Sequence, residues 1–495
     1  MSINFIPNDP LVSSLAMRTE EPRPDRLADQ AGFAVAGVQP ADIYAPGTPG
    51  FLRWQSRQAA LRAVLAWSEI LGEPVASWAE GAADQHRLPL LPDTGDDLNA
   101  YYDRESVSFF HHRIGADTVF SGASTDVVAH EVGHAILDAI RPSLWDSNYL
   151  ETGGYHEAFG DITAVLTALA DDQTRAALLA ENSDIARTNE VEATAEQLSD
   201  AIRMVAGPTH PASKPRHAFN TFQWQLPSTM PAEGGPDDMI AEVHSIARIM
   251  SGVFYDLLIA IYTASGDGGE AASLWKAATV AGRLIHHASR TAPQTPRFFQ
   301  SVGRSMVLAD EQLNAGANRE LIKQAFLRHG IALGTSAMTA PVVALAGQAP
   351  TADPATGRAA IDGPTGEDLR QRLDVPPGTP ITVSAVDLAG GLVKAAYWER
   401  VPLDDVDPRL SGVFAFADVQ VLVGESGSRA AVLGALPRPD DQARAVHTFA
   451  ASLAAAGQIA YDEATSRETT AEEAQPTHRI VTRDGSSLLE RIRFT

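Results

Sequence analysis

The feature that most constrains the fold is a histidine pair spaced for one face of a helix. The stretch "DVVAHEVGHAILDAI" (126–140) contains H-E-V-G-H, with His130 and His134 four residues apart. On a helix these two imidazoles lie one turn apart on one face, so both can bind a single metal ion. An ordinary helix with two surface histidines would give the same letters. The motif therefore needs a third ligand before it indicates a metal site.

A second stretch supplies that third ligand. "GGYHEAFGD" places Glu157 23 residues after His134, far enough for the chain to turn and return as an antiparallel helix. Asp161 follows one turn later on the same face, where it can accept a hydrogen bond from a zinc-bound imidazole. Gly160 lets the two helices approach closely. Because a catalytic zinc takes three protein ligands and keeps one open position, the sequence predicts a zinc site. The alternative is a solvated helix face.

The other histidines have ordinary interpretations. His156 is next to Glu157 but projects about 100° away from it on a helix, so we expect a polar residue beside the site and not a ligand. Four more histidines, two on a predicted strand and two on a predicted helix, are expected to have no role in the site: His111, His112, His286 and His287.

Composition narrows the class of protein. The net charge of −24 argues against nucleic acid or an anionic membrane as a partner, because both require clustered Lys and Arg. The chain has no cysteine, so a metal site must use His and carboxylate ligands. The N-terminus lacks the regions of a Sec signal, and no apolar run of 18 residues or more could span a membrane. We expect a cytoplasmic protein, or one exported by an unrecognised route, without membrane insertion. Its oligomeric state is not predicted.

The pattern along the chain divides it into four segments. Residues 1–50, rich in Pro and acidic residues, are expected to form a loosely structured arm. Residues 51–338 are expected to form one domain. Residues 339–368, rich in Ala, Pro and Gly, are expected to form a linker. Residues 369–495 are expected to form a separate small α+β domain of unknown role.

Within these segments the periodicity predicts specific elements. We expect helices at 51–73, 124–141, from about 156 onward and at about 239–265. The segment 99–114 alternates and is predicted to form two short strands. Near the end of the chain, "HRIVTRDGSSLLERIRF" predicts a hairpin that turns at Asp484-Gly485.

Several stretches, in order along the chain, resemble the thermolysin-like zinc metallopeptidases, which are gluzincins with H-E-x-x-H and a downstream glutamate. The matching stretches are "NAYYD" (99–103), "STDVVAHEVGHAILDAI", "GGYHEAFGDI", "DAIRMVAGP" (200–208), "AEVHSIARIMSGVFYDLL" and "ELIKQAFLRHGI" (320–331). Together they cover about residues 51 to 335. The resemblance implies an α+β fold: a thermolysin-like domain with a reduced N-terminal β lobe and a mostly helical C-terminal lobe, followed by the additional α+β domain.

The resemblance also implies roles by position. His130, His134 and Glu157 would bind Zn²⁺, and Glu131 would be the general base for a zinc-activated water. His244 would hydrogen-bond the tetrahedral intermediate. Arg203 would contact the substrate carbonyl or the supporting carboxylates.

Substrate contacts are implied in the same way. Asn99 and Ala100 would bind the substrate main chain. Val127 and Ile202 would help line an apolar pocket for the residue after the scissile bond.

The chain departs from the family pattern at several positions. For a tyrosine that assists the transition state, direct alignment gives Trp145, whereas a realigned loop gives Tyr149. His156 replaces the usual Asn before the third ligand. Asp126 matches one ligand of the family's calcium cluster, but Ala168 offers no carboxylate, so structural Ca²⁺ is not expected.

The sequence therefore predicts a zinc-dependent endopeptidase or oligopeptidase that cleaves peptide or protein substrates and prefers an apolar residue after the scissile bond. The alternative is a proteolytically inactive zinc-binding homologue that acts as a binding or regulatory protein. The two can be distinguished by whether the cleft between the strand of Asn99 and Glu131 is open or is filled by residues 1–50 or 340–495. The C-terminal domain could cover the cleft, recruit substrate or mediate assembly, and no motif decides among these roles.

Overall fold

The computed structural model describes most of the first 334 residues and parts of the remainder. The described residues are 1–24, 29–181, 185–266, 270–334, 359–360, 382–385, 392–426, 429–432, 439–461, 476–483 and 485–495. The expected linker, 339–368, lies outside them except for the two residues of β11 (Ala359–Ala360). Asp484, expected in the hairpin turn, also lies outside them.

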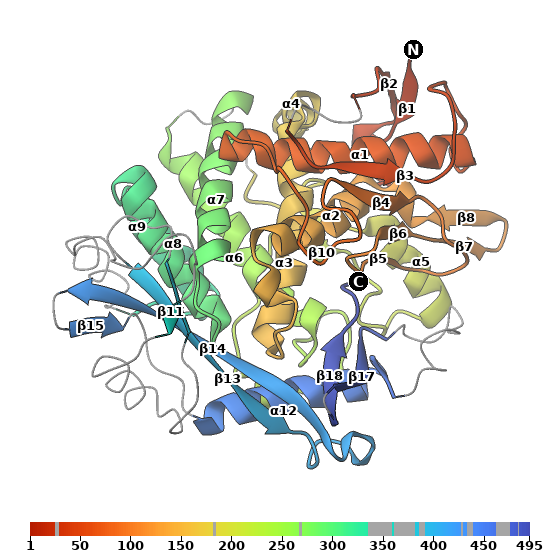
Figure 1. Ribbon diagram of the computed structural model, residues 1–495. Helices are drawn as coiled ribbons and strands as arrows, with labels where there is room; N and C mark the ends of the chain where they lie inside the picture. The colour runs from red at the N-terminus through yellow and green to blue at the C-terminus, as the bar shows by residue number, and fades with distance from the viewer. Residues whose placement is uncertain are drawn as a thin grey trace.

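A helical layer forms the centre of the molecule (Figure 1). Its inner helices are α2 (Thr125–Ile140), α3 (Leu150–Ala170) and α6 (Val243–Ala264). The helices around them are α1 (Pro49–Leu71), α4 (Asp172–Glu181), α5 (Glu196–Ala206), α7 (Ala271–Thr291), α8 (Phe298–Asn314) and α9 (Arg319–Arg328). The helices predicted from periodicity are present, with α3 beginning before its predicted start and α6 beginning after it.

Local chemistry sets the ends of α1. The Thr48 side chain accepts a hydrogen bond from the Phe51 backbone N–H, and Pro49 stands at the first helical position. Gly72 ends the helix in the left-handed conformation, with φ of 76°. A side-chain cap, an early proline and a left-handed glycine are the ordinary start and stop signals of a helix.

Among the described helices, only α6 is long and apolar enough to cross a membrane. Of its most apolar window, 78% is buried inside the structure. A long apolar helix enclosed by other elements is what the core of a folded domain requires.

A four-stranded sheet lies beside α1 and α2, in the order β3-β4-β6-β5. Its strands are β3 (Gly32–Val35), β4 (Arg87–Leu91), β5 (Ala100–Tyr102) and β6 (Val107–Phe109). β7 (His111–Ile114) and β8 (Asp117–Phe120) form a hairpin next to it. The segment predicted as two strands therefore contains three. β5 is an edge strand of its sheet, so one side of its backbone is free of strands from that sheet.

The first fifty residues are not the loosely structured arm that composition suggested. β1 (Ile3–Phe5) pairs with β2 (Arg18–Glu20), and β3 also belongs to this segment. Ile3, Phe5 and Phe33 are buried. Gln55 of α1 exchanges hydrogen bonds with the backbone of Ile6. A few buried apolar residues hold this segment against the rest of the fold. The average composition of the segment is dominated by proline and acidic residues, so it does not reveal them.

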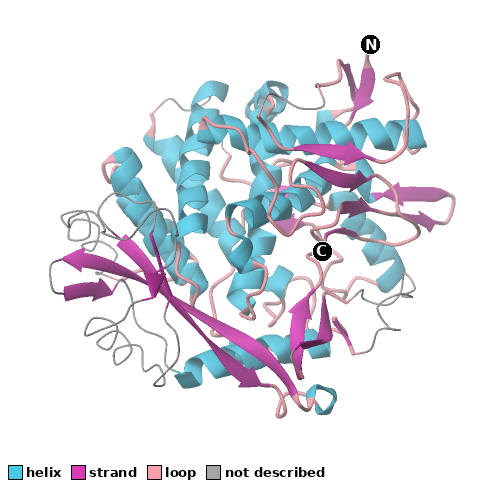
Figure 2. Ribbon diagram, viewed as in Figure 1, coloured by secondary structure: helices cyan, strands magenta, loops and turns pink. Residues whose placement is uncertain are grey.

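The C-terminal part is built mainly from strands, with one helix, α12 (Pro439–Ala455). The sheet has the order β11-β12-β13-β14-β18-β17-β16, and β15 also pairs with β14. Its strands include β12 (Thr382–Ala385), β13 (Leu392–Pro402), β14 (Val413–Ser426), β15 (Arg429–Val432), β16 (Ile459–Ala460), β17 (His478–Arg483) and β18 (Ser486–Arg491). The predicted hairpin is present as β17 and β18 (Figure 2).

This part, expected from sequence as a separate domain, makes contacts with the helical layer. Gln420 on β14 donates its backbone N–H to the Gln294 carbonyl and accepts a hydrogen bond from Arg141 at the end of α2. Asn148 donates to the carbonyl of Phe416. Buried side chains from both parts belong to one hydrophobic cluster. A composition shift can mark a connection along the chain, but it cannot show that β14 packs back onto the helices.

Candidate metal centre

The centre is built where α2 and α3 cross, and two glycines permit that crossing. A Cβ placed on Gly133 would lie 2.9 Å from the Cα of Gly160, and one placed on Gly160 would lie 2.6 Å from ring atoms of His130. Any larger residue at Gly160 would therefore overlap an imidazole of the metal motif. The close approach expected from sequence is present.

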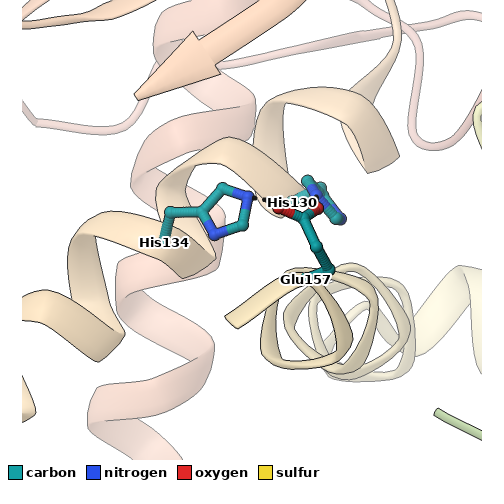
Figure 3. Close-up of side chains that lie close together, drawn as sticks. All are labelled: His130, His134 and Glu157. Carbon is teal, nitrogen blue, oxygen red and sulfur yellow. Dashed lines mark ion pairs between the residues drawn. The ribbon is translucent and has the colours of Figure 1, made fainter. Parts of the chain in front are cut away.

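Three side chains from these helices point at one another (Figure 3). The Nε2 atoms of His130 and His134 lie 3.3 Å and 3.7 Å from Oε2 of Glu157. All three side chains are buried, and the two imidazole nitrogens have no hydrogen-bond partner. Buried polar atoms that converge without a partner are costly unless a ligand satisfies them. Two imidazole nitrogens and one carboxylate oxygen are the donor set of a His₂Glu zinc site, so these residues fit zinc.

Behind His130 stands a network centred on Asp161. Nδ1 of His130 lies 3.0 Å from Oδ1 of Asp161, Arg216 donates to the same oxygen at 3.0 Å, and Ser251 donates to Oδ2 at 3.0 Å. The carboxylate thus accepts hydrogen bonds from three elements. It fixes the ring of His130 with Nε2 directed at Glu157.

His134 has a different support. Its Nδ1 lies 3.0 Å from Nδ1 of His156, so one ring donates and the other accepts. His156 was expected beside the site without a defined partner. The structure instead makes it the residue that orients His134, because the turn of α3 carries His156 behind the second imidazole of the motif.

Charges around the centre fix the protonation of its members. Burial favours the neutral acid, but the charge of His244 and the close contacts of His244 and His130 with the carboxylate outweigh it and hold the pKa of Glu157 well below its usual range. Burial lowers the pKa of His134 to about 3, so this imidazole is neutral, as a metal ligand must be. Burial opposes ionisation of Asp161, yet Arg216 and His130 lower its pKa to about 2. The pocket therefore holds two ionised carboxylates, which favour a cation.

Glu131 lies one residue after the first ligand. It is buried, and its Oε2 has no hydrogen-bond partner. Burial raises its pKa to about 8, with Glu157 adding to the effect and His130 opposing it. A carboxyl group in such a position can exchange a proton near neutral pH.

His244, at the start of α6, is also at the centre. Its Nδ1 lies 2.7 Å from Oε1 of Glu242, and its Nε2 lies 3.2 Å from Oε2 of Glu157. These two carboxylates overcome the effect of burial and raise the pKa of His244 well above its usual value. The imidazolium can thus donate from both nitrogens, and Nε2 also lies 2.6 Å from the backbone oxygen of Thr495.

Arg203 is not brought to the centre. It lies on the exposed face of α5 and pairs with Asp200 one turn earlier. The arginine beside the ligands is Arg216 on β10 (Arg216–His217), which pairs with β9 (Ala193–Thr194). Besides Asp161, Arg216 contacts Nδ1 of His130 at 3.2 Å. Of the two arginines, Arg216 and not Arg203 therefore contacts the carboxylate network.

The strand expected to bind a substrate backbone is β5, and it is already paired. Ala100 is buried, and the Asn99 side chain accepts from the Ala100 backbone N–H. Beyond them, Tyr102 donates its backbone N–H to the Phe494 carbonyl at 3.0 Å and accepts from the Phe494 N–H at 2.9 Å. Residues 493–495 therefore occupy the edge of β5 at which a substrate is expected, and Figure 1 places the C-terminus beside that strand.

The remaining predicted residues differ in burial and in their contacts. Val127 is buried on α2, and Ile202 is half-buried on α5. Tyr149 is buried at the N-terminal end of α3. Trp145, the other candidate from alignment, contacts the ring of Phe494 edge-on, with 5.4 Å between centroids.

A second carboxylate group lies at the N-terminal end of α2. Asp9, Asp126 and Glu196 place oxygens within 4.8 Å of one another. Asp126 was considered from sequence, but Asp9 and Glu196 were not. They come from segments 117 residues before and 70 residues after Asp126, and no local pattern joins them.

Comparison with known proteins adds an independent observation. The sequence model of the fungalysin metallopeptidase family (M36) matches residues 108–337. The matched region contains α2, α3 and α6, and with them the His130, His134 and Glu157 group. The fungalysin match covers less than half of the chain. No curated protein matches the chain.

The fungalysin match and the buried His-His-Glu group agree. At the level of a zinc metallopeptidase family, the resemblance found in the sequence is confirmed. The mixture of helices and sheets is also consistent with such a family. The narrower assignments concern individual catalytic roles and specificity, and they stay predictions.

Proposed function

We propose that this chain is a zinc-dependent peptidase that hydrolyses peptide bonds at the centre formed by α2, α3 and α6. The observation that supports this most directly is the convergence of three buried ligand atoms from His130, His134 and Glu157, of which the two imidazole nitrogens have no hydrogen-bond partner. Zinc bound there would polarise a scissile carbonyl and lower the pKa of a coordinated water to about 7.

Glu131 is the general base in this proposal. It follows a ligand on the same helix and is buried with a free carboxylate oxygen, so no other side chain competes for the proton that it accepts. It would take a proton from the attacking water and pass it to the leaving amine. General acid–base catalysis of this kind contributes about 10²–10⁴-fold.

His244 and Arg216 supply positive charge on the other side of the centre. His244 is held by Glu242 and directs Nε2 toward Glu157, where it can donate to an oxygen on which negative charge develops. Arg216 acts through Asp161 on His130, so we treat it as a positioning residue. Arg203 has no place in this scheme.

The substrate would bind as an extended chain along β5. An edge strand offers unpaired backbone N–H and C=O groups to an extended peptide. The backbone groups of Tyr102 already pair in this way with Phe494. Val127 and Ile202 are proposed to favour an apolar residue after the scissile bond. Whether the substrates are whole proteins or short peptides depends on how the cleft opens.

Zinc analysis combined with peptide cleavage tests the proposal. Both the full chain and a form truncated after Ile492 should be assayed, because Phe494 and Thr495 occupy the cleft. We expect zinc at one equivalent and cleavage of a peptide library that Glu131→Gln lowers by about 10²–10⁴-fold. Zinc content should be unchanged in that variant.

The matched control is Glu73→Gln, which makes the same chemical change on the exposed turn after α1. It should cleave as the unmodified chain does. Bound zinc without cleavage by either form of the chain would contradict the proposal.

One observation favours a second candidate function. The cleft beside β5 is filled by residues from the C-terminal part, as expected for a homologue that binds zinc without cleaving peptides and acts as a binding or regulatory protein. That candidate predicts that the truncated form also fails to cleave. The peptidase proposal predicts the opposite.

A further inference from the structure

The end of the chain enters the centre as an added β-strand. β18 leads from its pairing with β17 and β14 directly toward β5. Tyr102 and Phe494 then exchange both backbone hydrogen bonds, at 3.0 Å and 2.9 Å, in an antiparallel bridge. Extended peptides bind to exposed sheet edges by this same backbone pairing. Residues 493–495 thus occupy the edge of β5 in the manner of a bound peptide.

The side chain of Phe494 lies directly on the imidazoles of the centre. Its ring stacks on His156 with 3.7 Å between centroids and on His134 with 5.1 Å, and the interplanar angles are 13° and 18°. Trp145 closes the other side edge-on. Phe494 is 1% exposed. These three side chains form a pocket that a flat aromatic ring fills.

The backbone of Thr495 reaches the polar side of the same centre. Its backbone oxygen lies 2.6 Å from Nε2 of His244, and that nitrogen lies 3.2 Å from Oε2 of the ligand Glu157. The Thr495 oxygen therefore accepts a hydrogen bond from the same donor that we assign to the reacting oxygen of a substrate. A substrate oxygen and the Thr495 oxygen cannot both use His244 at the same time.

The segment is held in place by its own fold. The Arg491 guanidinium lies 4.1 Å from the centroid of the Phe494 ring, and its Nε donates to the Trp145 carbonyl. Ile492 donates its backbone N–H to the carbonyl of Thr477, the residue just before β17. The hairpin thus directs residues 493–495 into the cleft.

We propose that residues 493–495 are an internal peptide ligand of the metal centre, which excludes substrate until the segment is displaced. The ligand class that the cleft selects is an extended peptide with an aromatic side chain one residue before the backbone oxygen that contacts His244. The effect on hydrolysis rests on the proposed peptidase function, whereas the binding does not.

Binding is tested without catalysis. The protein is Glu131→Gln truncated after Ile492, and the probe is a fluorescein-labelled peptide with the sequence of residues 490–495, followed by fluorescence polarisation. We expect saturable binding that is at least about tenfold weaker in full-length Glu131→Gln, because a tethered competitor acts at a high effective concentration. A probe with Ala in place of Phe should also bind at least about tenfold more weakly. Equal binding to the full-length and truncated proteins would overturn the proposal.

Hydrolysis is tested in the full chain, so that the result does not depend on whether the truncated form folds. Phe494→Ala should raise kcat/KM for peptide substrates by about tenfold or more, and the 490–495 peptide added in trans should reverse the gain. The control Thr482→Ala changes an exposed residue of the same hairpin away from the cleft and should leave kcat/KM unchanged. Thermal melts check that each variant is folded.

The outcomes separate this proposal from the proposed function. If the probe binds the truncated protein but no form of the chain cleaves any peptide, the internal ligand stands and the peptidase function falls. If the full chain cleaves as fast as Phe494→Ala and the truncated form, the peptidase function stands and the internal ligand falls.

Discussion

His134 and His156 face each other through Nδ1 atoms that lie 3.0 Å apart. The Nε2 atom of His134 points at the metal position, so its Nδ1 must carry the hydrogen and His156 must accept it. Burial, with His134 adding to it, lowers the pKa of His156 well below its usual value, and this keeps the acceptor lone pair available. The His156 imidazole thus orients His134 in the way that the Asp161 carboxylate orients His130.

We therefore predict that His156→Leu weakens zinc binding by about 10–100-fold, the usual cost of removing a residue that orients a ligand. His156→Asn should keep most of the affinity, because its amide oxygen can accept the same hydrogen. Competition with a chromophoric chelator measures both. A purely packing role for His156 would give losses of similar size in the two variants.

Gly160→Ala should disrupt the centre through one methyl group. The added Cβ would lie 2.6 Å from ring atoms of His130, closer than two such atoms can approach, so the imidazole or the helix must shift. We expect zinc affinity to fall by at least about tenfold. Gly235→Ala is the control, since its Cβ would meet its nearest neighbour at an ordinary 3.5 Å. Zinc titration of the two proteins decides, and equal affinities would show that α2 and α3 can separate without cost.

The local part of the centre could be predicted from sequence. His130, His134, Glu157 and Asp161 lie on two consecutive helices, and the 3.6-residue period fixes which side chains share a face. Ser251 could have been found in the same way, because it lies seven residues after His244 on α6 and therefore on the same face.

The parts that sequence reasoning missed depend on contacts between distant segments. Arg216 lies on a two-residue strand after a long loop, whereas Arg203 lies in a regular helix that is easier to align. The pairing of Phe494 with Tyr102 joins residues nearly four hundred positions apart. Neither the period of the hydrophobic residues nor the composition of a segment contains information on such a contact. The role of Arg216 and the filled cleft could therefore be found only from the three-dimensional structure.

The two arginines give a matched pair of variants. Arg216→Ala removes a donor to Asp161 and should lower kcat/KM by about 10–100-fold, with most of the loss in kcat and in zinc affinity. Arg203→Ala removes only an exposed ion pair with Asp200, which contributes little, and should change kcat/KM less than twofold. Steady-state kinetics with zinc titration measures both. A larger loss in Arg203→Ala would restore the assignment made from sequence.

Glu196 makes the stability of the protein depend on pH. Burial, together with Asp126 and Asp9, raises its pKa from an ordinary 4.5 to about 9. The folded state thus holds this proton more tightly than the unfolded state. Stability from this group is fully present below about pH 4.5 and is lost as the pH rises toward 9. Glu196→Gln removes this titration, so the folded state no longer has to take up a proton, and it should raise Tm at pH 8 by about 2 °C while leaving Tm at pH 4.5 unchanged.

The measurement is a pair of thermal melts on the zinc-loaded protein without other divalent cations, with Glu73→Gln as the exposed control. A parallel series with calcium separates two causes. If a cation among Asp9, Asp126 and Glu196 neutralised the charge, calcium would raise the Tm of the unmodified chain and abolish the advantage of Glu196→Gln. A change in Tm that is the same at pH 4.5 and pH 8 would show that Glu196 acts through packing, since only a titrating group makes the difference depend on pH.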